Sequence, residues 1–381
     1  MLRTVGPVPW WSNVRACHRC CAPGVRPPHC RAAPPGRRRR ARPRPDRAGP
    51  DPPVPTGGVR VSIRTARTRT APAPGGGELA FTHWPGAHGG APLEAPVLIA
   101  LHGITANGRA FDAVADALDT ALPDASLYAP DLRGRAASAA LRGPYGLAAH
   151  VADVLALLDH LGQERAVLIG HSMGGFVAAL AAARHPSRVA GTVLVDGGLP
   201  FPGTGAAGGA GGDGAGEEDA IDAQLEAVIG PAMRRLSMTF PDRDSYAGFF
   251  REHPAIRPLW NEDVRAYFDR DLVGTEPELR SSCVLEAVRA DGRGVLVEPL
   301  LRTALREPGP PAVFLWAERG MLDEPQGLYG AENPPGLGLL HPERVASRRV
   351  DGVNHYSIVM AAEGARAVAE ATAEVARRAA V

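Results

Sequence analysis

The chain has 381 residues, of which 45% are hydrophobic and 22% charged, an ordinary composition for a globular protein. This length predicts either two domains or one large α/β domain with an insertion. The net charge is +1, but residues 1–58 carry 12 Arg against two Asp, so a basic extension precedes a mildly acidic body. An acidic body argues against a nucleic-acid partner, and the absence of an apolar run of about 18 residues argues against a membrane-spanning protein.

Residues 1–58 are rich in Pro and Arg and lack hydrophobic periodicity, which predicts a disordered extension. The spacing of its cysteines lacks a second, well-separated pair and therefore disfavours a zinc site. These cysteines are Cys17, Cys20, Cys21 and Cys30. Cys283 stands alone in the body and predicts no disulfide framework. A lone cysteine and the lack of an unbroken apolar signal segment together predict a cytoplasmic protein.

From residue 59 onward, short apolar runs alternate with segments of helical periodicity. Residues 59–64 and 78–84 alternate in polarity and predict a hairpin across a Gly/Pro-rich turn. Continuous apolar runs predict six further strands that are buried on both faces. These runs are residues 97–101, 126–129, 166–169, 192–195, 313–316 and 347–350.

Helices are predicted between these strands, at residues 147–161, 176–183 and 363–378. Alternation of strands and helices predicts an α/β fold, with a mostly parallel eight-stranded sheet covered by helices on both faces. This core comprises residues 59–202 and 309–381.

Residues 203–308 interrupt this alternation. Most of residues 203–216 are Gly or Ala, which predicts a flexible linker. Residues 217–308 have helical patterns and predict a cap inserted after the strand at residues 192–195. The aromatic residues of this cap are expected mainly to pack on one another. They are Phe240, Tyr246, Phe249, Phe250, Trp260, Tyr267 and Phe268.

A Gly-His-Ser-Met-Gly segment, centred on Ser172, follows the strand at residues 166–169 and opens the next helix. This context is what a G-x-S-x-G nucleophile elbow requires, because the serine must stand on a sharp turn between strand and helix. The flanking glycines are needed where a Cβ atom would collide with neighbouring backbone. Ser172 is therefore the predicted nucleophile.

Three further segments accompany this elbow. A backbone N–H of the His102-Gly103-Ile104 turn, together with that of Met173, would face a developing oxyanion. His102 itself is expected to be a structural hydrogen-bonding residue. The Asp131-Leu-Arg133-Gly sequence is interpreted as a loop tied by charge-assisted bonds. His355 follows the last predicted strand and precedes the last helix.

These motifs, in this order, resemble the α/β-hydrolase family over residues 59–381, apart from the cap. The resemblance implies that Ser172 is the nucleophile and His355 the general base. It also implies that the backbone N–H groups of Ile104 and Met173 form the oxyanion hole.

The acid of the triad has two candidates. The commonest family acid follows the strand at residues 313–316, but Gly320 stands where it is expected. Some branches of the family, including one group of haloalkane dehalogenases, place the acid where Asp196 stands. Asp323, three residues further along the later loop, is the alternative. We favour Asp196 and keep both open.

The resemblance implies acyl transfer to water from a small or medium apolar ester, without a metal or organic cofactor. A serine at the elbow argues against dehalogenase and epoxide hydrolase activity, since those enzymes use an aspartate nucleophile. A lactonase, thioesterase, carbon–carbon bond hydrolase or cofactor-free perhydrolase could use the same triad. A non-catalytic ligand-binding scaffold is the alternative from another class. The sequence predicts a small-molecule partner, no nucleic acid and no membrane, and it leaves the oligomeric state open.

Overall fold

The computed structural model describes residues 65–87, 96–201, 221, 223–226, 230, 232–330 and 338–380. Ser62–Val381 form one compact unit. The predicted disordered extension, residues 1–58, and the predicted linker, residues 203–216, lie outside the described residues.

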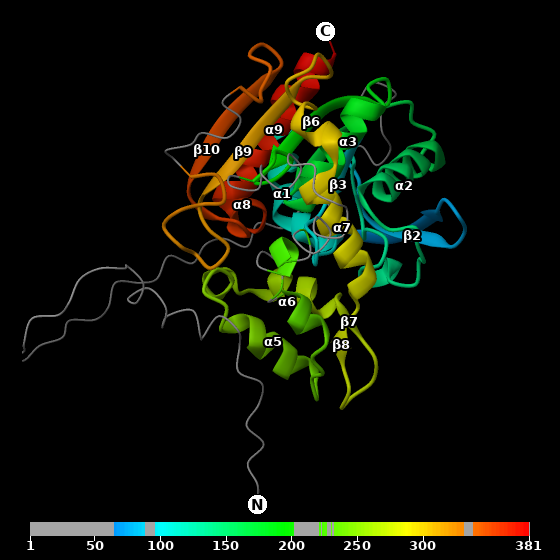
Figure 1. The fold of residues 1–381 in the computed structure, drawn as a ribbon, viewed down its shortest axis with the longest axis vertical. Coiled ribbons are helices and arrows are strands. Elements are labelled where there is room, and N and C mark those ends of the chain that lie inside the picture. The colour runs from blue at the N-terminus through cyan, green and yellow to red at the C-terminus, as the bar shows by residue number, and fades with distance from the viewer. Residues whose placement is uncertain are drawn as a thin grey trace, which may run out of the picture. The chain divides into compact units, whose positions relative to one another are not determined.

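An eight-stranded sheet forms the centre of this unit, in the order β1-β2-β4-β3-β5-β6-β9-β10 (Figure 1). Strand β2 pairs antiparallel with β1 and β4, and all other neighbours are parallel. The predicted mostly parallel eight-stranded α/β sheet is thereby confirmed. The strands are β1 Arg67–Pro72, β2 Glu78–Trp84, β3 Leu98–Leu101, β4 Leu127–Pro130, β5 Ala166–His171, β6 Val189–Val195, β9 Ala312–Arg319 and β10 Val345–Asn354.

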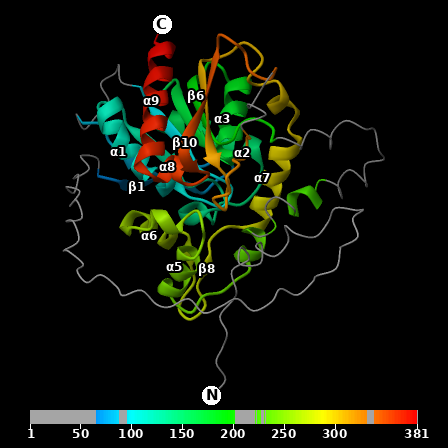
Figure 2. The same cartoon turned by 90° about the vertical axis from the view of Figure 1, so that its left-hand side faces the viewer.

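Helices cover both faces of the sheet. Figure 2 shows α1 and α9 on one side of the strands and α2 and α3 on the other. The helices of the core are α1 Asp112–Ala121, α2 Leu147–His160, α3 Met173–Arg184, α8 Ser357–Met360 and α9 Ala362–Ala379, with short 3-10 turns at Gly108–Phe111 and Ala136–Ser138.

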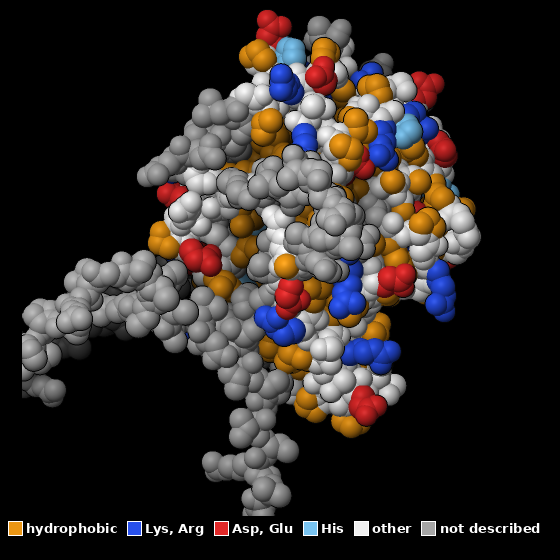
Figure 3. All heavy atoms as spheres, viewed as in Figure 1, with side chains coloured by type: hydrophobic (Ala, Val, Ile, Leu, Met, Phe, Trp, Pro, Cys, Tyr) orange, Lys and Arg blue, Asp and Glu red, His pale blue; other side chains and the backbone are white. Residues whose placement is uncertain are grey.

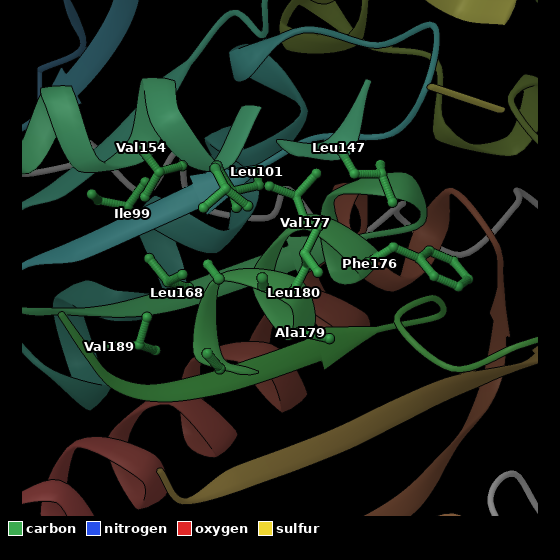
Figure 4. Packing of buried hydrophobic residues seen from close by; sticks show 14 of the residues in the cluster. Ile99, Leu101, Leu147, Val154, Leu168, Phe176, Val177, Ala179, Leu180 and Val189 are labelled. Carbon is green, nitrogen blue, oxygen red and sulfur yellow. The ribbon is translucent and has the colours of Figure 1, made fainter. Parts of the chain in front are cut away.

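The main hydrophobic core lies between the central strands and the α2–α3 layer. Ile99 and Leu101 of β3 lie beside Val154 of α2 and Val177 of α3 (Figure 4). Each of these side chains is at most 2% exposed, and burial of one such side chain contributes about 1.5–3 kcal/mol. This packing holds the carboxyl ends of the parallel strands in fixed positions relative to one another.

The predicted first strand of the hairpin is wrong. The partner of β2 is β1 at Arg67–Pro72, with Pro72 opposite Glu78, and not residues 59–64, which lie outside the described residues. Gly75, Gly76 and Gly77 all have positive φ and close the turn immediately after β1. Strand β1 alternates Arg and Thr at the edge of the sheet and is almost fully exposed. It therefore lacks the apolar pattern by which a strand is found in a sequence.

The segment between β6 and β9 contains helices and a small two-stranded sheet, which the helical prediction did not include. Figure 1 shows α5, α6 and the β7–β8 pair grouped beyond one end of the large sheet, with α7 leading back towards the core. Its elements are α5 Arg243–Arg251, 3-10 turn Arg257–Leu259, α6 Glu262–Asp269, β7 Leu272–Val273, β8 Arg280–Ser281, α7 Leu285–Val297 and 3-10 turn Pro299–Arg302. We call residues 221–308 the insertion.

Aromatic rings fill the interior of the insertion. Phe268 stacks on Phe250 with ring centroids 3.9 Å apart and on Trp260 at 5.8 Å. Phe240 contacts Tyr246 at 4.9 Å and Phe249 at 5.7 Å, both edge to face. As expected, these side chains mainly pack on one another and hold the short helices together.

The surface in Figure 3 carries acidic and basic side chains interspersed with apolar ones. In the described part of the chain, no helix combines the length and apolar character needed to cross a membrane.

Candidate active site

Ser172 stands on a sharp turn between β5 and α3. Its backbone has φ 54° and ψ −122°, a left-handed conformation that is strained for a residue with a Cβ atom. The Ser172 N–H donates to the carbonyl of Val195 at 2.9 Å, and the Ser172 carbonyl accepts from Gly175 N–H at 2.9 Å. These bonds hold the strained turn at the carboxyl ends of β5 and β6.

The glycines around this turn leave no room for a side chain. A Cβ atom on Gly174 would lie 1.9 Å from the Leu101 carbonyl oxygen, and one on Gly170 would lie 2.3 Å from the Gly174 oxygen. A Cβ atom on Gly103 would lie 3.6 Å from Ser172 Oγ. The loop after β3 therefore runs directly beside the serine hydroxyl.

His355 follows the end of β10 and contacts Asp196, which follows β6. Its Nδ1 lies 2.7 Å from Asp196 Oδ2, and the two residues are 4% and 0% exposed. Because a carboxylate only accepts, Nδ1 carries the proton of this hydrogen bond. The second oxygen of Asp196 accepts from Ala317 N–H at 3.1 Å.

The other candidate acid lies elsewhere. Asp323 forms a bidentate pair with Arg319, with both nitrogen–oxygen distances at 2.8 Å. Its Oδ1 also accepts from Asn354 Nδ2 at 3.1 Å, and its side chain is 29% exposed. The structure thus brings His355 to Asp196 and directs Asp323 to an arginine.

His171 links the serine turn to the histidine loop, and the sequence analysis assigned it no role. Its Nε2–H donates to the backbone carbonyl of His355 at 2.8 Å, and the two rings lie 4.7 Å apart. Burial, together with the nearby charge of His355, holds the pKa of His171 well below its usual value, so the ring is neutral. In the sequence, only its place directly before the predicted nucleophile marks this histidine.

The predicted oxyanion donors are Met173, directly after the serine, and Ile104, directly after Gly103. Met173 is the first residue of α3, so its N–H has no partner within the helix. Ile104 lies in the loop after β3, two residues beyond His102. The Nδ1–H of His102 donates to Gly103 O at 2.7 Å, while its Nε2 accepts from Leu132 N–H at 2.9 Å. Burial lowers the pKa of His102 to about 3, which keeps this ring neutral beneath the loop, as expected for a structural residue.

The two charged residues of the Asp-x-Arg-Gly loop are tied to separate partners. Arg133 pairs with Asp153 of α2 at 2.6 Å. Asp131 accepts from Gly108 N–H at 3.0 Å and pairs with Arg270 of the insertion at 2.7 Å. The predicted charge-assisted bonds are present, and one of them joins the core to the insertion. Among the described residues, no group of three His, Cys, Asp or Glu side chains is arranged to hold a metal ion.

Residues 96–210 match the sequence model of the α/β-hydrolase fold. The structure also resembles the thioesterase domain from the curacin biosynthetic pathway, with a TM-score of 0.59 over 81% of this chain and 99% of that domain, at 19% identity. Together with the sheet topology and the serine turn, these likenesses show that the chain has the α/β-hydrolase fold.

Individual relatives match over a shorter segment. The lipase LipV of Mycobacterium tuberculosis is 38% identical over 99 residues, which are 26% of this chain and 36% of the lipase. The 3-hydroxybutyrate-oligomer hydrolase of Cupriavidus necator is 35% identical over 101 residues, 26% of this chain and 32% of that protein. The matched segments span about a third of the length of these relatives.

Proposed function

We propose that this chain is a serine hydrolase that cleaves a carboxylic ester through an acyl-enzyme, with Ser172, His355 and Asp196 as its catalytic triad. The observation that carries the proposal is the buried 2.7 Å contact between His355 and Asp196, in a loop that His171 ties to the strained serine turn. A buried carboxylate that orients an imidazole beside a serine is the arrangement that activates this weak nucleophile.

In the proposed mechanism, Ser172 Oγ attacks the ester carbonyl carbon while His355 Nε2 takes its proton. Asp196 holds the imidazole in the required tautomer and stabilises its charged form. His355 then protonates the leaving alcohol, activates a water molecule and so releases the acid from the acyl-enzyme. His171 does not compete for the proton, because its lowered pKa keeps it neutral.

The negative oxygen of each tetrahedral intermediate would accept hydrogen bonds from the Ile104 and Met173 N–H groups. The close approach of Gly103 to Ser172 supports this assignment, because the Ile104 N–H belongs to the peptide that directly follows Gly103. Removing one such donor costs about 10²–10³ in kcat in a well-studied protease.

The proposed substrate is a small or medium apolar ester, with the insertion acting as a cap. Apolar side chains of the insertion pack against Ile104 and support an apolar environment beside the oxyanion hole. These are Leu225, Met233, Cys283 and Val288. A lipase and an oligomer hydrolase among the relatives support hydrolysis as the reaction type.

Labelling with a fluorescent fluorophosphonate tests the mechanism. Wild type should react covalently, whereas Ser172→Ala should not, and only wild type should hydrolyse p-nitrophenyl esters. Thioesters, lactones, vinylogous diketones and peracid formation in the same panel distinguish the other reactions that this triad could support. A folded wild-type protein that neither labels nor turns over any of these substrates would favour the non-catalytic binding scaffold.

A further inference from the structure

Arg135 is the largest fully buried side chain in the described part of the chain. Its Nε donates to the backbone carbonyl of Ile104 at 2.9 Å, and its Nη1 donates to Arg133 O at 2.8 Å. The same Nη1 lies 2.5 Å from Oδ2 of Asp291, which is also fully buried. A guanidinium in the interior is tolerated only where such partners compensate its charge.

Asp291 lies on α7 and joins the insertion to two parts of the core. Besides Arg135, its Oδ2 contacts His150 Nε2 at 3.0 Å, and its Oδ1 accepts from Gly146 N–H at 2.8 Å. Burial raises the pKa of Asp291, but His150 and Arg135 outweigh this effect and hold the pKa below its usual value. Asp291 is therefore a carboxylate that anchors α7 to α2 and, through Arg135, to Ile104.

The Ile104 side chain also contacts the insertion. It packs against the apolar cluster of the insertion that includes Val288. Val288 and Asp291 are three residues apart on α7 and so lie on one helix face. The cluster that packs against the Ile104 side chain thus includes a residue of α7, and Asp291 of α7 holds the Ile104 carbonyl through Arg135, which leaves the Ile104 N–H as the group that can face a substrate.

We propose that Arg135 and Asp291 are positioning residues that couple the insertion to the oxyanion hole by anchoring the Ile104 carbonyl. This inference rests on the proposed function, in which the Ile104 N–H stabilises the oxyanion. Such a donor works only within about 2.7–3.1 Å of the developing charge. Loosening the anchor should therefore lower kcat and leave KM nearly unchanged, because the hydrogen bond is stronger in the transition state than in the bound substrate.

The chain contains a matched control. Arg133 and Asp153 form a second buried Arg–Asp pair in the same loop, 2.6 Å apart, with side chains 4% and 1% exposed. The Arg133 guanidinium otherwise donates to the carbonyls of Arg142 and Pro74, whereas the bond to the Ile104 carbonyl comes from Arg135. Asp291→Asn and Asp153→Asn thus remove equivalent buried charges, but only the first loosens the oxyanion loop.

The experiment compares both variants with wild type in p-nitrophenyl ester hydrolysis, below their melting temperatures. The kcat of Asp291→Asn should fall about tenfold or more, which is less than the loss expected when an oxyanion donor is removed altogether. The kcat of Asp153→Asn should stay within about threefold of wild type. Arg135→Lys keeps a cation for Asp291 but loses the bond to Ile104, and should show the same kcat loss even if Asp291→Asn folds poorly. Equal kcat losses in Asp291→Asn and Asp153→Asn, or wild-type kcat in Arg135→Lys, would overturn the coupling.

A second readout does not need activity. Amide hydrogen exchange of the peptide covering residues 100–108 should speed up in Asp291→Asn and Arg135→Lys and stay as in wild type in Asp153→Asn. Unchanged exchange in the first two variants would refute the anchor even in a catalytically silent protein. Failure of wild type to hydrolyse or label, with the exchange pattern as expected, would instead refute the proposed function.

Discussion

The loops that follow the neighbouring strands β6 and β9 each present an aspartate, and the two surroundings differ. Asp196 is fully buried, and its oxygens meet an imidazole and a backbone N–H. Asp323 is partly exposed, and both of its oxygens meet the guanidinium of Arg319. A carboxylate already paired with a cation has little negative potential left to orient a histidine, whereas one held by a neutral N–H keeps its charge for that task.

The two loops also differ in how closely they approach the serine. A Cβ atom on Gly197 would lie 2.1 Å from the Ser172 carbonyl oxygen, which is rigid backbone. A Cβ atom on Gly320 would meet the flexible end of Glu324 at 2.3 Å and, less closely, the backbone oxygen of Gln326 at 3.0 Å. The loop after β6 is thus packed against the nucleophile turn, and the loop after β9 encloses mainly its own side chains.

Among the substitutions that test the difference between the two loops, Asp196→Asn should have the largest effect on activity. An amide cannot hold His355 in the tautomer that accepts the serine proton, so kcat should fall about 10⁴-fold with little change in KM. Steady-state hydrolysis of a p-nitrophenyl ester measures both constants. A loss of less than about tenfold would mean that Asp196 is a structural residue.

Alanine substitutions at Gly197 and Gly320 should lower the free energy of unfolding by different amounts. Gly197→Ala should cost about 3 kcal/mol and disturb labelling of Ser172, because the new methyl group collides with backbone that cannot move away. Gly320→Ala should cost about 1 kcal/mol or less, since Glu324 can swing aside. Urea unfolding of both variants gives the difference, and equal losses would show that the two loops are packed alike.

His102, beneath the loop after β3, is fully buried like Asp196, and this predicts a pH effect that the partly exposed Asp323 loop should not share. The folded-state pKa of His102 is about 3, below the ordinary 6.5, so the unfolded chain binds a proton more readily. Its contribution to stability is complete above pH 6.5 and is lost as the pH falls towards 3. Between pH 6.5 and 5 the loss should be about 2 kcal/mol.

His102→Gln, which cannot titrate, isolates this contribution from those of the other histidines. Its free energy of unfolding should fall less steeply than that of wild type between pH 6.5 and 5. Identical slopes would mean that His102 is protonated as readily in the folded protein as in the unfolded chain, at the cost of the bond from Leu132 N–H, because a protonated Nε2 cannot accept.

The sequence predicted best the elements whose burial is complete. The apolar runs at residues 166–169 and 192–195 lie within β5 and β6, because strands covered on both faces carry no polar interruption. The exposed edge strand β1 was placed wrongly because almost none of its side chains is buried. The serine turn was predictable from local spacing, since strand, glycines and helix are contiguous in the chain.

The surroundings of the two aspartates were not predictable in the same way. Asp196 and His355 are 159 residues apart, so only the parallel pairing of β6, β9 and β10 brings their loops together. The Arg319–Asp323 pair is local, but a sequence does not say whether such a neighbouring pair forms or whether the carboxylate turns to the histidine. The ties of Asp131 and Asp291 to distant partners carried no sequence signal for the same reason.

Asp323→Asn, in the loop after β9, should have the smallest effect on stability and activity. Partly exposed ion pairs contribute about 0–1 kcal/mol, so the loss of the Arg319 pair should lower stability by no more than this. The rate should stay within about threefold of wild type, since His355 keeps Asp196 and the amide can still accept from Asn354. A loss of kcat approaching that of Asp196→Asn would show that His355 can exchange its partner during turnover. The two loops would then contribute a single, shared acid site, and the burial of Asp196 would not by itself identify the catalytic acid.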